Sequence, residues 1–238
     1  MPLTKIPKKR EPLWKESNFN ADKRGVRNTF YSVNGDQYTG EWENNKKNGK
    51  GTQVWKKTGA IYDGDWKDDQ RCGFGTLSYP SNDVFRKVYS GGWKNDKRHG
   101  YGTNFYTNTE YYEGEWYTNK RSGWGRMYYG DGSVYEGEWF NDLKNGQGML
   151  RLANENRYEG LWKEDKKHGE GKFFYLNKGQ LYTGVWVEDI AKCGTMEDFG
   201  REGAPQPTIY PIPKCELLDQ TAVTKEAEEK FLEQCENQ

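Results

Sequence analysis

The sequence is organised around a motif that is seen most simply in Tyr112-Glu113-Gly114-Glu115-Trp116, with Gly123-Trp124-Gly125 a few residues later. Tyr-x-Gly-x-Trp occurs seven times, with successive copies 23 to 27 residues apart, at Tyr38, Tyr62, Tyr89, Tyr112, Tyr135, Tyr158 and Tyr182. Gly-x-Gly follows in six copies, beginning at Gly49, Gly73, Gly100, Gly123, Gly146 and Gly169. Recurrence at such a period predicts a repeat architecture, in which each repeat is stabilised mainly by its neighbours.

The motif has the period of a β-strand. Tyr, Gly and Trp occupy positions i, i+2 and i+4, which lie on one face of a strand, and the residues between them are mostly acidic, as suits a face in water. The Gly-x-Gly segment alternates in the same way. The sequence therefore predicts one antiparallel hairpin per repeat, preceded by a half-repeat that begins at residue 25. The expected fold is all-β: about 14 strands in an elongated, twisted, single-layer meander.

The hairpin loops set the predicted register. A two-residue loop at Thr58-Gly59 places Trp55 opposite Tyr62 and Gly51 opposite Trp66, so that a large ring faces a glycine across the strands. Copies spaced by 23 residues are one residue shorter than those spaced by 24, and we expect a β-bulge to absorb the difference. We also expect an insertion around residues 80–88 and one extra residue before Gly194.

The two motifs resemble the MORN repeat, whose unit reads Tyr-x-Gly-x-Trp followed by Gly-x-Gly. The resemblance covers residues 25–195, read as seven MORN repeats plus the half-repeat. It implies a curved single-layer β-sheet that acts as an adaptor. Relatives with this repeat are linked to cilia, flagella, male germ cells and spermatogenesis, including the acrosome. This setting is what the resemblance implies, and it does not follow from the periodicity.

The composition favours a thin, aromatic-rich structure over a thick aliphatic core. The chain has 238 residues, of which 33% are hydrophobic and 16% aromatic, and its 36 basic and 36 acidic residues give no net charge. Low apolar content with many charges would otherwise suggest disorder. No amino-terminal apolar run is present, nor any stretch of the roughly 20 apolar residues that a membrane-spanning helix needs. The four cysteines are widely spaced.

These features lead us to expect an intracellular, cytoplasmic protein in a reducing environment. The family resemblance adds two more specific locations, the surface of the acrosome or a secretory vesicle and the axoneme of a cilium or flagellum.

Both ends of the chain differ from the repeats. We expect residues 1–24 to form a basic arm, residues 196–220 a proline-containing extended linker, and residues 221–236 an amphipathic helix with an apolar stripe at Val223, Ala227 and Phe231. One short helix does not bury its apolar stripe by itself. It needs a groove on this sheet, on a second copy in a homodimer, or on another protein. Binding to its own sheet would make the tail an inhibitor of partner binding.

We find no arrangement of residues suited to catalysis, a cofactor or a metal. His99 and His168 occupy equivalent turns many strands apart, and the cysteines and histidines lack the spacing of a zinc site. The Gly-x-Gly pairs lack the helix and the Gly-Lys-Ser/Thr ending of a phosphate loop. A chain without net charge or a contiguous basic face is also a poor match for nucleic acid. The expected function is therefore non-enzymatic.

A protein-binding scaffold is the leading hypothesis, because an exposed face of Tyr and Trp is suited to anchoring a helix or an extended peptide of a partner. The candidate residues on this aromatic face are Tyr38, Trp42, Trp55, Tyr62, Trp66, Tyr89, Trp93, Tyr106, Tyr112, Trp116, Tyr129, Tyr135, Trp139, Tyr158, Trp162, Tyr175, Tyr182 and Trp186. The alternative use of the Trp residues is packing between repeats, which would leave the second-strand aromatics Tyr106, Tyr129 and Tyr175 as the contacts for partners.

The basic residues of the turns support a second hypothesis, peripheral attachment to a membrane or vesicle through weak contact with anionic lipids. The candidate residues are Lys46, Lys47, Arg71, Lys97, Arg98, Lys120, Arg121, Lys166 and Lys167. Acidic residues in the same turns would weaken this contact, and solvated turns that prevent edge aggregation are the simpler interpretation. A third hypothesis is a fixed structural component of an axonemal assembly, with its groove permanently filled.

Overall fold

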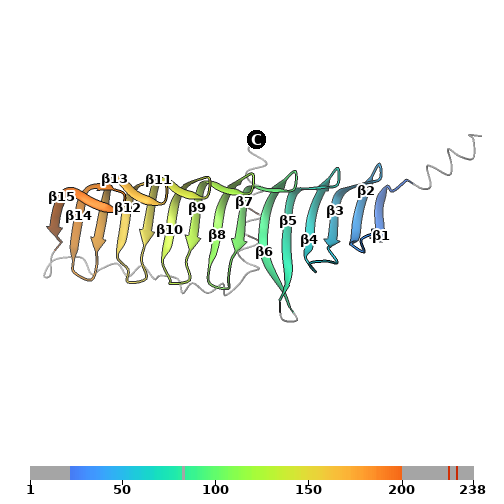
Figure 1. Cartoon of the computed structure of the whole chain (residues 1–238), viewed down its shortest axis with the longest axis horizontal. Coiled ribbons are helices and arrows are strands. Elements are labelled where there is room, and N and C mark those ends of the chain that lie inside the picture. The colour runs from blue at the N-terminus through green and yellow to red at the C-terminus, as the bar shows by residue number, and fades with distance from the viewer. Residues whose placement is uncertain (1–21, 82–83, 200–224, 226–228, 230–238) are drawn as a thin grey trace, which may run out of the picture.

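The structure, a computed structural model, describes residues 22–81, 84–199, 225 and 229. In this part of the chain, 15 strands form one antiparallel sheet, and each strand pairs with its neighbours in sequence (Figure 1). The strands are β1 Gly25–Tyr31, β2 Gln37–Glu43, β3 Lys46–Val54, β4 Ile61–Lys67, β5 Gln70–Ser81, β6 Val84–Lys94, β7 Lys97–Phe105, β8 Tyr111–Tyr117, β9 Lys120–Tyr128, β10 Val134–Phe140, β11 Leu143–Arg151, β12 Arg157–Lys163, β13 Lys166–Tyr175, β14 Gln180–Val187 and β15 Ile190–Asp198. The predicted all-β, single-layer meander is confirmed.

The half-repeat expected from residue 25 is β1. Gly25 lies opposite Trp42 in the same way that Gly49 lies opposite Trp66. At the other end, β15 runs to Asp198 and so includes the first residues assigned to the linker. The expected basic arm, linker and carboxyl-terminal helix otherwise lie almost entirely outside the described residues, and they stay predictions.

The predicted hairpin register is wrong by two residues. Gly51 lies opposite Gly64, and Trp66 lies opposite Gly49. The cause is the loop: the Trp55 N–H donates to the Ala60 carbonyl (2.9 Å), which leaves four residues, 56–59, in the loop instead of two.

Glycine faces glycine in the middle of every strand pair from β2 to β15. The resulting unbroken row is Gly40, Gly51, Gly64, Gly75, Gly91, Gly102, Gly114, Gly125, Gly137, Gly148, Gly160, Gly171, Gly184 and Gly194. The motif tyrosines lie over this row: a Cβ on Gly51 would overlap the Tyr38 ring, and one on Gly75 would overlap the Tyr62 ring. As expected, rings pack over glycines, but the residues that lie opposite each other on neighbouring strands differ from those predicted.

Loop length absorbs the difference between repeats of 23 and 24 residues, so the expectation of a bulge for this purpose is wrong. The loop at residues 56–59 has four residues. The loops at residues 130–132 and 153–155 have three, closed by bonds from the Tyr129 N–H to the Ser133 carbonyl and from the Leu152 N–H to the Asn156 carbonyl.

A β-bulge does occur, at the same place in seven hairpins, between the glycine pair and the tryptophan pair. In six of these hairpins the first glycine of Gly-x-Gly lies in the bulge at positive φ, as at Gly123 (95°) and Gly146 (85°), a conformation that glycine adopts without strain.

Two repeats depart from the pattern. The expected insertion near residues 80–88 is present, because β5 and β6 are the longest strands, with 12 and 11 residues, and their hairpin projects beyond its neighbours (Figure 1). In the last repeat, Gly184 lies opposite Gly194 and Trp186 opposite Ala191. Gly194 is therefore the second glycine of its motif, and its bulge holds one residue fewer, so the expectation of an extra residue is wrong.

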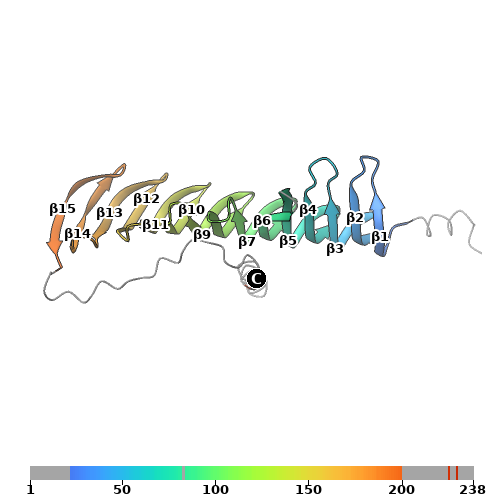
Figure 2. The same cartoon turned by 90° about the horizontal axis from the view of Figure 1, so that it is seen from below.

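The motif rings are buried, which corrects the expectation that they form an exposed face. Tyrosine and tryptophan rings alternate along the sheet with centroids 5.1–5.6 Å apart and planes at 82–90°, and their exposed fractions are 0–6%. We call this set the ring array: Tyr38, Tyr62, Tyr89, Tyr112, Tyr135, Tyr158, Trp42, Trp66, Trp93, Trp116, Trp139, Trp162 and Trp186. Each inner ring is enclosed by two others, and the strands curve along their length (Figure 2), so one sheet layer buries the array.

We predict that Gly125→Ala destabilises the sheet by about 2–3 kcal/mol, because the added methyl group would overlap the Tyr112 phenol in a closely packed array. Gly130→Ala is the matched control from the same repeat, since its methyl group would lie 4.0 Å from the nearest neighbouring atom, Thr109 Oγ1. Neither glycine has positive φ. Chemical denaturation measures both changes, and equal stability of the two variants would contradict the packing of rings on the glycine row.

Candidate protein-interaction site

Most polar atoms of the ring array are satisfied within the sheet; the indole N–H groups of Trp42 and Trp186, at its two ends, have no partner among the described residues. Six tyrosine hydroxyls donate to the backbone carbonyl three residues later, as Tyr112 does to Glu115 (3.1 Å). Five indole N–H groups donate to a glycine carbonyl of the preceding repeat, as Trp139 does to Gly125 (3.1 Å). Burial raises the pKa of the phenols, to about 12 for Tyr158, so they stay protonated at neutral pH. The array is therefore a structural element with little capacity left for a ligand.

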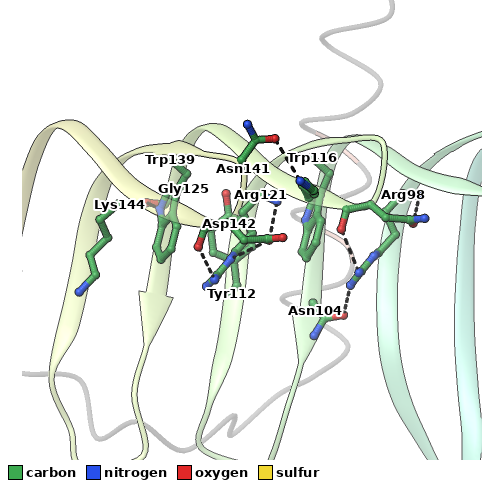
Figure 3. A network of polar contacts seen from close by, with 12 residues as sticks. Arg98, Asn104, Tyr112, Trp116, Arg121, Gly125, Trp139, Asn141, Asp142 and Lys144 are labelled. Atoms are coloured by element: carbon green, nitrogen blue, oxygen red, sulfur yellow. Dashed lines mark hydrogen bonds and ion pairs between the residues drawn. The ribbon is translucent and has the colours of Figure 1, made fainter. Parts of the chain in front are cut away.

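The turns at one edge of the sheet join each repeat to the next (Figure 3). Each is a two-residue turn with both residues at positive φ, and its second residue is Asn or Asp. Asp142 Oδ1 accepts the Arg121 N–H (2.9 Å), and the Asp142 N–H donates to the Arg121 carbonyl (3.0 Å). The same two backbone contacts recur at Asn45, Asp69, Asp96, Asn119, Asp165 and Asp189.

The residue whose backbone makes both bonds with each turn is a Lys or Arg. Its side chain covers the ring array. The Arg121 guanidinium carbon lies 4.1 Å from the Trp139 ring centroid, and its Nη2–H donates to the Asp142 carbonyl (2.7 Å). We call these side chains, which lie 4.1–5.1 Å from a tryptophan centroid, the cation row: Lys23, Lys47, Arg71, Arg98, Arg121, Lys144 and Lys167. Contact with a ring face stabilises a cation.

Burial also changes the pKa of three lysines in the cation row. It lowers the pKa of the Lys47, Lys144 and Lys167 ammonium groups, and nearby turn carboxylates oppose the effect. These cations are therefore partly removed from solvent, which is the opposite of what a free lipid-binding charge requires.

The nine candidates for lipid contact separate into two groups. Lys47, Arg71, Arg98, Arg121 and Lys167 are half-buried in the cation row, whereas Lys46, Lys97, Lys120 and Lys166 are exposed. Two of the exposed group form ion pairs with the next turn, Lys46 with Asp68 (3.0 Å) and Lys166 with Glu188 (3.4 Å). Among the described residues, no helix is long and apolar enough to cross a membrane, and no three His, Cys, Asp or Glu side chains are grouped to hold a metal.

A row of partly accessible, mostly aromatic side chains lies on the same face as the ring array, near the ends of the strands opposite to the turns of the cation row. We call them the edge row, the residues four positions after the second glycine: Trp55, Tyr79, Tyr106, Tyr129, Leu152 and Tyr175. Tyr79 and Tyr106 are each 40% exposed, and the other four are half-buried and pack against the ring array.

Among the sequence candidates, Tyr106 is exposed and Trp55, Tyr129, Tyr175 and Tyr182 are half-buried, whereas the others belong to the buried ring array. Tyr182, the last motif tyrosine, is half-buried with its ring 5.6 Å from that of Trp186. Sequence reasoning missed Tyr79 and Leu152. Their constant distance from the second glycine was the signal that could have found them.

The opposite face of the sheet also carries an accessible ring, which sequence reasoning did not select. Trp124, the middle residue of its Gly-x-Gly, is 50% exposed and borders a hollow of about 180 Å³. Arg126 lies beside it, 3.3 Å from Glu113 and 3.1 Å from Glu136. Because this guanidinium is paired on both sides, the cluster is a structural tie between β8, β9 and β10.

Comparison with known proteins gives six of the seven repeats. A model of the MORN repeat matches residues 38–59, 62–84, 89–106, 112–134, 135–157 and 158–179. The chain is 68% identical over 229 residues to MORN repeat-containing protein 3 of Homo sapiens, covering 95% of each chain. It is 64% identical over 234 residues to the Mus musculus protein of that name (98% and 97% covered) and 61% over 231 residues to the Xenopus laevis one (96% and 97%).

The chain therefore belongs to the MORN repeat family, as its motifs indicated. The hairpin of β14 and β15 lies outside the six matched segments, although it continues the sheet. This hairpin also has a shortened bulge and lacks the first glycine of the motif.

We predict that Asp142→Gly lowers stability by about 1–2 kcal/mol, because it removes the acceptor of the Arg121 N–H without straining a turn at positive φ. Asp142→Asn is the matched control, since Asn119 accepts the equivalent Arg98 N–H (2.8 Å) in the preceding repeat. This variant should stay within about 0.5 kcal/mol of the parent. Denaturation curves measure both, and an equal loss in the two variants would mean that the carboxylate charge, not the hydrogen bond, joins the turns.

Proposed function

We propose that the chain is a non-enzymatic scaffold that binds partner proteins along its edge row. The observation that carries the proposal is the division of one sheet face: the ring array is buried, while Tyr79 and Tyr106 are each 40% exposed beside half-buried neighbours. Tyr and Trp are among the residues that most often dominate the energetics of protein interfaces. The edge row thus supplies aromatic anchors on a sheet whose interior is already satisfied.

The shape of the edge row favours an elongated partner. Its six positions follow one another at a spacing of two strands, about 10 Å, so a helix or extended segment lying along the sheet would meet several of them. The projecting hairpin adds Val84 and Phe85, which are 67% and 57% exposed. Arg86 Nη1 donates to the Tyr106 carbonyl (2.7 Å), which holds this hairpin against the neighbouring loop.

Lipid attachment has weaker support. The cations that would have to meet an anionic headgroup are either seated on the ring array or exposed in turns that also carry Asp and Glu. A fixed place in an axonemal assembly would use the same edge row as a scaffold does. The germ-cell, acrosomal and ciliary settings come from the family resemblance, and we include them in the proposal on that basis alone.

We predict that Tyr79→Ser combined with Tyr106→Ser weakens partner binding at least ~10-fold, because two aromatic anchors are lost. Trp124→Ser is the control, since it removes a similarly exposed ring from the opposite face. Proximity labelling in the native tissue identifies partners, and titration of the purified partner measures each affinity.

Unchanged affinity in the double variant would contradict the proposal. Salt-sensitive sedimentation with anionic vesicles, together with no protein partner, would favour the lipid alternative instead.

A further inference from the structure

The last described residues of the sheet lie beside the edge row. β15 ends at Asp198, and the Phe199 N–H donates to the Gly179 carbonyl (3.0 Å) in the loop between β13 and β14. That loop starts directly after Tyr175, the last member of the edge row. The chain therefore leaves the sheet at the carboxyl-terminal end of this row.

The spacing of the edge row matches one conformation of a peptide. Strands lie about 4.8 Å apart, so equivalent positions in successive repeats are about 9.6 Å apart. A polyproline II helix rises about 9.3 Å in each three-residue turn. Two turns of an α-helix rise about 10.8 Å, and side chains of a β-strand alternate with a period of two residues, so both fit less well.

A proline-rich segment follows soon after the point of exit. Residues 205–213 read Pro-Gln-Pro-Thr-Ile-Tyr-Pro-Ile-Pro. With three residues per turn, Pro205 and Pro211 fall on one side of a polyproline II helix, and Pro207 and Pro213 fall on a second side. Nine residues in this conformation span about 25 Å, which is enough to cross three consecutive positions of the edge row.

The three positions nearest to the exit are suited to prolines. Tyr175 and Tyr129 provide half-buried rings, with the apolar Leu152 between them. Neither phenol hydroxyl makes a hydrogen bond to a described residue, so each can donate to the backbone carbonyls of a polyproline II segment, which have no internal partners.

We propose that residues 205–213 dock in polyproline II conformation along the edge row over Tyr175, Leu152 and Tyr129, so that the chain occupies part of its own partner-binding surface. This proposal rests on the proposed function, because it takes the edge row to be a docking surface. The charges are complementary: residues 214–238 contain seven acidic and three basic side chains, and one side chain of the cation row reaches the edge row, with Lys144 Nζ 5.8 Å from the Tyr129 ring centroid.

Limited trypsin digestion of the full chain tests the docking. Cleavage after Lys214, directly beyond the segment, requires that the chain around it be released, whereas cleavage after Lys225 serves as the internal reference. We expect cleavage at Lys214 to become at least ~10-fold faster when Pro205, Pro207, Pro211 and Pro213 are all changed to Ala, because tethering gives the docked segment a high effective concentration. Tyr129→Ser with Tyr175→Ser should have the same effect.

Trp124→Ser is the matched control on the opposite face and should leave the rate at Lys214 unchanged. Melting curves check that the variant with Tyr129→Ser and Tyr175→Ser is folded. If it is not, the test depends on the proline variant, which leaves the sheet unchanged. Equal rates in the parent and the proline variant would overturn the proposal. The scaffold function would survive that result, because it is judged separately by partner affinity in the Tyr79 and Tyr106 variant.

A labelled peptide of residues 203–214 provides a second readout. It should bind the full-length proline variant, whose edge row is open, more tightly than the parent chain, whose edge row is occupied, by ~10-fold or more. Equal binding to both proteins would show that the parent does not occupy its own surface and would overturn the proposal. Binding to neither would do the same, since the edge row would then not accept this sequence.

Discussion

The contact between a tyrosine ring and a pair of facing glycines is the interaction on which the rest of the structure depends. Because neither Gly40 nor Gly51 has a side chain, the Tyr38 ring lies flat over the strands, and its hydroxyl reaches the Glu41 carbonyl (3.0 Å). The Trp66 ring then meets the Tyr38 ring at 85°. Repetition of this contact gives a core one ring thick, so the sheet needs no second layer.

The side chains on this face of the sheet form three parallel rows with different roles. The ring array holds the strands together. The cation row covers it on one side, and the turns at that edge of the sheet join each repeat to the next. The edge row, on the other side, carries the large side chains of this face that stay partly accessible. The proposed partner-binding role therefore falls on residues adjacent to the most regular part of the motif, since the array has used its surface and most of its hydrogen bonds in folding.

The periodicity of the sequence was sufficient for the strands, the half-repeat at β1 and the insertion at β5 and β6, because these depend on spacing alone. The register was not predictable in the same way, since it depends on whether a loop holds two, three or four residues. The burial of Trp139 under Arg121 was also missed. It arises because a basic side chain just after a turn at positive φ on β9 lies over a ring of the following strand β10, a three-dimensional effect that a charge pattern does not reveal.

Chemical acetylation of tyrosine in the native full chain, mapped by mass spectrometry, tests most directly whether the rings of the motif are enclosed by their neighbours. Tyr79, Tyr106 and Tyr117 are 40%, 40% and 65% exposed and should react readily, whereas Tyr62, Tyr112 and the other array tyrosines should react at least ~100-fold more slowly, only when the sheet opens. Reaction of any inner array tyrosine as fast as Tyr106 would contradict the buried array and the division of the sheet face that follows from it.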